Sequence, residues 1–286
     1  MKLRQVSGIA RPLALDYRTN RWITLLTLVV LIVSGLWRVL LGQSWLAATA
    51  WSVTAALSVF LAWAIARELD PDAELAAFAA VGLTLPALAA SGLGWMPLPD
   101  LAGLFLLMLA VRVLNRTTGV AATLPDTLGL LALGLWLGYQ SSPVYLAAAV
   151  AALLVDGLLG PADRGRLALA AAAAAVGGLL ITIGSPPDDF GGSPARAPLV
   201  VQALLLAALV LSALFTVTIR AAAQVHSLAD DTADPLSPRR VRAGQLLALL
   251  AAVGILLGHG GAGLIALLPL WAAMAATGVY RLAAGR

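Results

Sequence analysis

The sequence has 286 residues, of which 61% are apolar and only 11% charged, and its mean hydropathy is +0.94. Soluble domains carry about a quarter charged residues, so the composition excludes an ordinary soluble protein and predicts an all-α, polytopic transmembrane helical bundle. The absence of cysteine excludes disulfides, thiolate metal sites and cysteine nucleophiles. The net charge of +4 does not indicate a nucleic-acid partner, because the basic residues are spread between apolar runs.

Ten apolar runs approach or reach the roughly 20 helical residues that cross a hydrocarbon core. In chain order they are residues 22–42, 45–66, 75–95, 98–114, 124–141, 143–160, 166–184, 197–222, 241–259 and 261–282. Residues 1–21 form an N-terminal segment, whose residues 6–17 mix apolar and charged side chains as in a segment at the membrane interface. The first run is longer than the apolar core of a signal peptide, so we expect it to be retained. The fifth and sixth runs are short, and a re-entrant hairpin is the alternative for this pair.

The arginines predict the orientation of the bundle. With the connections assigned alternately to the two sides, every Lys and Arg except Arg38 and Arg196 falls on the side that holds both termini. Short cytoplasmic loops are enriched in Lys and Arg, so we predict a multi-pass protein of the cell (cytoplasmic) membrane with both termini in the cytoplasm. The connection 220–242 is then a cytoplasmic linker or helical extension, and the proline- and glycine-rich connection 185–198 is an irregular loop outside.

The ten runs form a single transmembrane domain, residues 22–286, that divides into two sets of five, residues 22–142 and 143–286. Because five is odd, the second set enters the membrane inverted relative to the first, as in many secondary transporters. In number of spans and in orientation the chain resembles the ten-helix drug/metabolite transporter superfamily. This resemblance is topological and assigns no functional residue.

The first candidate site is the acidic turn in RELDPDAE, with the candidate metal ligands Glu68, Asp70, Asp72 and Glu74. Clustered carboxylates at a membrane surface suit Mg²⁺ whose coordination is completed by a substrate phosphate. The alternative is local: Asp70 or Asp72 caps the following helix, and Glu74 favours the helix dipole from its first turn. The turn is therefore either a Mg²⁺-phosphate site or a helix cap.

Further polar residues are expected on the same side of the membrane. The candidates for binding a substrate or phosphate are Arg112, Asn115, Arg116, Asp126 and Asp156. Two arginines four apart lie on one helical face and can clamp a phosphate or carboxylate; as the alternative, they anchor the helix by the positive-inside rule. The acidic groups at the inner ends of the second and sixth spans resemble in placement the UbiA-type intramembrane prenyltransferases, which bind Mg²⁺-diphosphate, although their NDxxDxxxD-like motif is replaced here by RELDPDAE and by Asp156 with Asp163.

No ionisable residue lies at mid-depth in the predicted spans, which disfavours a pump with a central carboxylate relay. His226 and His259 fall on opposite sides and cannot share a metal. Three functions stay open: a transporter-like bundle for a small neutral or amphipathic solute, a lipid-processing enzyme with a Mg²⁺-phosphate site at the acidic turn, and a scaffold subunit without substrate. The expected partners are the lipid bilayer and a small or lipid-like ligand, with a homo-oligomer or a partner subunit left open.

Overall fold

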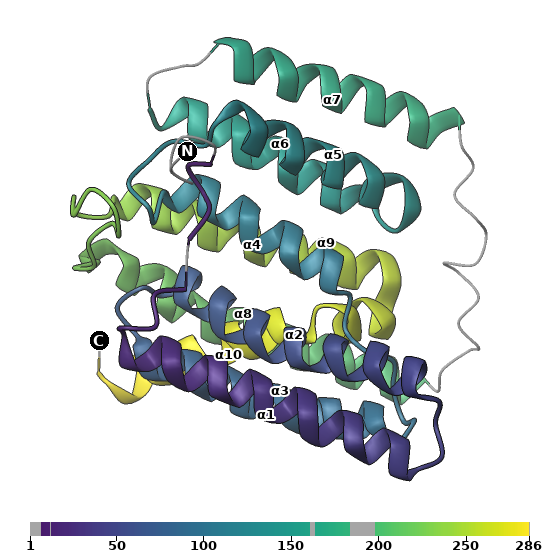
Figure 1. Cartoon of the computed structure of the whole chain (residues 1–286). Coiled ribbons are helices and arrows are strands. Elements are labelled where there is room, and N and C mark those ends of the chain that lie inside the picture. Colours follow the sequence, from purple (N-terminus) through teal and green to yellow (C-terminus); the bar gives the residue numbers. More distant parts are fainter. Residues whose placement is uncertain (1–6, 12, 161–163, 184–197, 286) are drawn as a thin grey trace.

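The computed structural model describes residues 7–11, 13–160, 164–183 and 198–285 (Figure 1). Nearly all of this part of the chain is helical. The helices are α1 (Arg18–Leu40), α2 (Trp45–Leu69), α3 (Glu74–Gly92), α4 (Leu101–Asn115), α5 (Leu124–Gln140), α6 (Pro143–Leu158), α7 (Arg164–Ile183), α8 (Pro198–Ala221), α9 (Pro238–Ala266) and α10 (Leu268–Ala283), with a 3-10 turn η3 (Ala222–Gln224).

Each of the ten predicted runs overlaps one of these helices, which confirms an all-helical bundle. Among the described residues, five helical segments are long and apolar enough to cross a membrane: Arg18–Leu40, Trp45–Leu69, Glu74–Gly92, Leu205–Gln224 and Pro238–Ala266. Leu101–Asn115 and Pro143–Leu158 are shorter apolar helices. The chain is therefore a membrane protein by the character of its helices, while ten spans with both termini inside stay a prediction.

The boundary between the ninth and tenth runs differs from the predicted one. The chain turns sharply at Gly260 (φ 57°, ψ −136°) and continues helically to Ala266 before α10 begins. Only glycine adopts this conformation readily. The segment after Gly260 passes close to the part of α9 before it, since a Cβ on Gly263 would lie 2.5 Å from the carbonyl oxygen of Ile255.

The helices lie side by side with their axes roughly aligned (Figure 1). Helix α2 packs on α1, α3, α4 and α10, and α4 also packs on α6 and α9. Helix α7 packs on α5 and α6 at one edge. An inverted repeat would make α7 the counterpart of α2, yet the two helices have different surroundings; the division into two halves stays a prediction.

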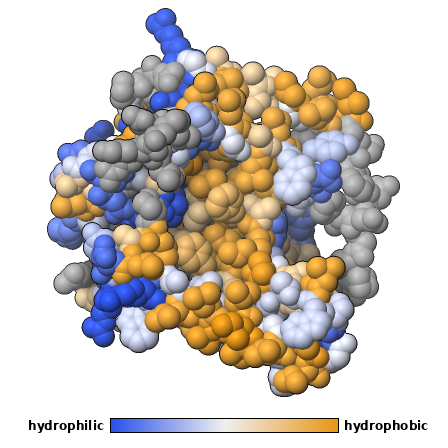
Figure 2. Space-filling model, in the orientation of Figure 1, coloured by the Kyte–Doolittle hydropathy of each residue, from blue (hydrophilic) through white to orange (hydrophobic). Residues whose placement is uncertain are grey.

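Apolar side chains cover much of the visible surface. Figure 2 shows a hydrophobic band across the middle of the molecule with hydrophilic residues gathered toward the end that holds the N-terminal part. Helix α1 buries only Ile23 of its side chains, while Ile32 and Val33 are more than half exposed. An exposed surface of this kind suits contact with lipid acyl chains.

We call the end of the bundle that carries the C-terminal ends of α2, α4, α6 and α10 the basic end. Two irregular segments fold over it: the N-terminal segment, whose described residues are 7–11 and 13–17, and the loop at residues 222–237. The loop is neither a free linker nor a long helical extension. It forms a short hairpin with a bridge between Leu228 and Pro235, and the amides of Asp230 and Asp231 donate to the carbonyls of residues 117 and 118. The predicted outer loop lies outside the described residues except for residue 198.

Candidate functional site

The predicted polar residues all lie at the basic end, where most of the charged ones form ion pairs and Asn115 and Asp126 form hydrogen bonds. Glu68 is 1% exposed, and its Oε1 accepts a hydrogen bond from Arg112 Nε at 2.7 Å and faces Arg11 Nη1 at 3.5 Å. The Asn115 side chain donates to the carbonyl of Glu68 at 2.7 Å, and Gln245 donates likewise to the carbonyl of Leu69. These amides satisfy carbonyls that the end of α2 leaves without helical partners.

Asp70 ends helix α2 and is bound by Arg281 of α10. The two guanidinium–carboxylate distances are 2.7 and 2.6 Å, and both side chains are buried. Burial raises the pKa of Asp70 above its ordinary value, in spite of the hydrogen bonds from Arg281 that lower it. Asp70 therefore joins the turn after α2 to α10.

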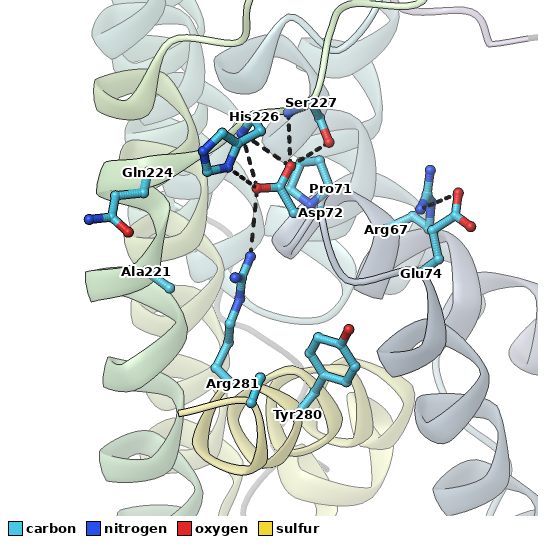
Figure 3. A pocket seen from close by; sticks show the side chains of 11 residues that line it. Arg67, Pro71, Asp72, Glu74, Ala221, Gln224, His226, Ser227, Tyr280 and Arg281 are labelled. Carbon is cyan, nitrogen blue, oxygen red and sulfur yellow. Dashed lines mark hydrogen bonds and ion pairs between the residues drawn. The ribbon is translucent and has the colours of Figure 1, made fainter. Parts of the chain in front are cut away.

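Asp72 anchors the loop at residues 222–237. It accepts hydrogen bonds from the amides of His226 and Ser227 and from the Ser227 hydroxyl, and Arg281 approaches it at 3.9 Å (Figure 3). Partial burial raises the pKa of Asp72, but these hydrogen bonds outweigh it and hold the pKa below its ordinary value. The surrounding pocket has a volume of about 490 Å³.

Glu74, the last member of the acidic turn, pairs with Arg67 at 3.2 Å to one side of this pocket (Figure 3). The four carboxylates thus face different partners, and no group of three or more His, Asp and Glu side chains in the described part of the chain is arranged to hold a metal ion. The predicted cap by Asp70 or Asp72 is wrong, because helix α3 begins after Ala73 without a side-chain hydrogen bond. The predicted metal role stays a prediction, with the carboxylates already engaged.

Arg112 and Arg116 do not share a partner, although they lie four residues apart. Arg112 faces Glu68, whereas Arg116 lies beyond the last turn of α4 in the left-handed region (φ 50°, ψ 49°) and binds both oxygens of Asp156 at 2.9 and 3.0 Å. Arg240 reaches the same carboxylate at 2.6 Å and Arg166 at 3.3 Å. Asp156, which is 2% exposed, therefore connects α4, α6, α7 and α9.

Asp126 has a local role and a tertiary one. It forms a capping box with Thr123 at the start of α5. It also accepts hydrogen bonds from the Ser7 hydroxyl and the Gly8 amide, while the Thr118 hydroxyl donates to the Gly8 carbonyl. These contacts hold the N-terminal segment across the basic end.

Beneath the N-terminal segment lies a second cavity, which we call the N-terminal pocket. Its volume is about 450 Å³, within the roughly 300–1,000 Å³ typical of small-molecule sites. It is lined by Ala10, Arg11, Leu13, Ala14, Tyr17, Thr19, Asn20, Phe60, Trp63, Ala64, Arg67, Glu74, Phe105, Met108, Arg112, Thr118, Asp230 and Asp231.

Helices α2 and α4 line this pocket with side chains in the same order, apolar first and arginine last. Helix α2 contributes Phe60, Trp63 and Arg67, and α4 contributes Phe105, Met108 and Arg112, in both cases at positions i, i+3 and i+7. These positions lie near one face of a helix, and seven residues rise about 10 Å. Because the two helices end side by side at the basic end, the pocket has an apolar, aromatic part at depth and guanidinium groups toward the basic end.

Of the residues that line this pocket, sequence reasoning singled out Glu74 and Arg112 but not Phe60, Trp63, Arg67, Phe105 and Met108. The available signal was the equal aromatic-to-arginine spacing in the second and fourth runs. Its meaning depended on knowing that α2 and α4 are neighbours.

The chain matches no family model, and no curated protein or solved structure shows significant similarity to it.

Proposed function

We propose that this protein is a transporter-like membrane bundle that takes a small amphipathic molecule into the N-terminal pocket from the cytoplasmic side. The observation that supports this proposal is the two-part lining of the pocket: aromatic and apolar side chains lie at depth, and three arginines lie at the basic end. The basic end is assigned to the cytoplasm by the positive-inside rule. An amphipathic molecule bound there places its apolar part at membrane depth and its polar part near water.

The apolar wall of the pocket supports a site for a hydrocarbon chain. Phe105 lines the pocket and is 45% exposed, whereas Trp63 and Met108 on the same wall are buried. Phe60 and Trp63 lie with ring centroids 5.9 Å apart. A hydrocarbon chain bound beside Phe105 would contact these rings.

In our proposal, the N-terminal segment is the part that moves to open the pocket. It covers the pocket through Arg11 and is fixed to the bundle by contacts of Ser7, Gly8 and Arg11. Arg11 pairs with Asp230 as well as with Glu68. In our proposal, release of these contacts opens the pocket to the cytoplasm.

The test measures equilibrium binding of radiolabelled 16-carbon amphiphiles to the full-length protein in nanodiscs, with carboxylate, phosphate, hydroxyl and trimethylammonium heads. We expect saturable binding of at least one probe, and a five- to thirtyfold weaker affinity in Phe105→Ala, the equivalent of about 1–2 kcal/mol of lost apolar contact. Leu128→Ala is the matched control, because Leu128 on α5 is similarly exposed (48%) and does not line the pocket. Saturable binding of none of the probes, or equal effects of the two variants, would contradict the proposal.

Movement is tested separately, by transfer of the bound probe across proteoliposomes. We expect the wild-type protein to transfer the probe faster than Phe105→Ala. If the probe binds but is not transferred, the protein is a binding protein and the transporter part of the proposal is wrong. The geometry gives no comparable support to the lipid-processing enzyme, since the acidic turn is divided among separate ion pairs.

A further inference from the structure

We infer that the N-terminal pocket selects amphiphiles whose head group is an oxygen acceptor, a carboxylate or phosphate, bound in a fork by the two terminal nitrogens of Arg112. This inference rests on the proposed function and specifies its ligand. It depends on how Arg112 is engaged by the protein.

Arg112 is held by one nitrogen only. Its Nε donates to Glu68 Oε1 at 2.7 Å, and within the described part of the chain its Nη1 and Nη2 have no hydrogen-bond partner. The side chain is 14% exposed and lines the N-terminal pocket. Arginine presents two parallel N–H groups that match the spacing of carboxylate or phosphate oxygens. With the side chain fixed through Nε, the fork is oriented before a ligand arrives.

Three of the carboxylates near the fork are engaged by guanidinium groups. Glu74 pairs with Arg67, and Asp230 pairs with Arg11. Glu68 is bound by Arg112 through Nε and approached by Arg11. Asp231 lines the pocket as well, so Glu68, Glu74, Asp230 and Asp231 outnumber the three arginines of this region. The specificity is therefore assigned to the fork geometry and not to a net positive field.

Trp63 belongs to the apolar wall of the pocket. It is 8% exposed, and its indole Nε1 is buried with almost no accessible surface, so a molecule in the pocket can contact the ring but not the N–H. The head group is therefore assigned to Arg112 at the basic end, and the hydrocarbon chain to the wall that carries Trp63.

The first experiment compares the four 16-carbon probes on wild type, Arg112→Lys and Arg242→Lys. Lysine keeps a positive charge beside Glu68 but lacks the fork, and Arg242 is the control because it lies outside the pockets and binds the carbonyl of Ile219. We expect carboxylate and phosphate heads to bind at least tenfold more tightly than hydroxyl and trimethylammonium heads. This preference should fall to less than threefold in Arg112→Lys and persist in Arg242→Lys.

A second comparison tests whether the hydrocarbon chain is required. Acetate and inorganic phosphate are included as heads without chains, and we expect them to compete at least a hundredfold more weakly than the probes. If these free anions compete at the same concentrations as the probes, the inference that the ligand is an amphiphile is wrong, and the ligand is a soluble anion.

The outcomes separate the two proposals. If no probe binds, the proposed function fails. If probes bind without a preference for carboxylate and phosphate, or if Arg112→Lys keeps the preference, the proposed function stands and the head-group inference fails. Size-exclusion profiles like those of wild type confirm that the variants are folded.

Discussion

Asp70 and Arg281 form the most deeply buried contact of the acidic turn, with side-chain exposures of 4% and 9%. Removing one partner of a buried ion pair leaves an uncompensated charge, which typically costs about 3–5 kcal/mol. We expect Asp70→Asn to destabilise the protein on this scale, measured by chemical unfolding in detergent. The double variant Asp70→Leu/Arg281→Met should recover most of the loss, because apolar replacements of a buried pair are often tolerated. An Asp70→Asn variant as stable as the wild type would show that the pair adds nothing to stability.

The lowered pKa of Asp72 gives a pH dependence of known sign. A carboxylate whose pKa is lower in the folded than in the unfolded protein contributes stability above its unfolded pKa, about 3.9, and loses it as pH falls through the folded pKa. The stability difference between wild type and Asp72→Asn should thus be constant above about pH 5 and should shrink below about pH 4. Thermal unfolding between pH 3 and 7 measures it. A difference that grows on acidification would contradict the assigned hydrogen bonds.

At this scale, the sequence predicted where the polar residues lie but not how they pair. Acidic residues and arginines at span ends had to meet at one end of the bundle if the topology was right. Whether Arg116 faced Glu68 or Asp156 depended on a left-handed residue after α4 and on α6 lying beside it. The caps predicted at the acidic turn failed because Arg281 and the loop amides compete for the same carboxylates.

At the scale of elements, the glycines of α5 test the helix packing. A Cβ on Gly134 would lie 2.8 Å from the Ala149 Cβ, and one on Gly138 would lie 2.9 Å from the Leu146 Cβ, whereas Gly129 has open space. Gly134→Ala and Gly138→Ala should each destabilise by about 1–3 kcal/mol through overpacking. Gly129→Ala should be neutral or should stabilise by up to about 1 kcal/mol through helix propensity. Equal effects at the three positions in thermal unfolding would contradict the close approach of α5 and α6.

The existence of the helices could be predicted, because apolar runs of this length have few other structures in a membrane. Their neighbours could not be predicted, since lipid-facing and helix-facing apolar residues look alike in composition. The reversal at Gly260 also escaped prediction in detail: a single glycine does not indicate that the chain continues as a short helix packed against the carbonyl of Ile255.

For the whole molecule, the absence of cysteine makes the predicted orientation directly testable. Gln224 lies exposed after α8 at the basic end, and Gln140 lies exposed at the far end of α5. We expect a membrane-impermeant maleimide to label Gln140→Cys in intact cells and Gln224→Cys only after permeabilisation. Labelling of both variants from one side would contradict the assignment of the two ends, and the reverse pattern would place the basic end outside.

The most direct test of the central claim is to map where an amphiphile binds. The purified protein is photolabelled with a 16-carbon carboxylate that carries a diazirine in its chain, and the adducts are located by mass spectrometry with and without excess unlabelled palmitate. We predict palmitate-sensitive adducts in residues 60–64 of α2 and 105–108 of α4, which form the apolar part of the N-terminal pocket. Adducts confined to the lipid-facing surface of α1, unchanged by palmitate, would contradict the account.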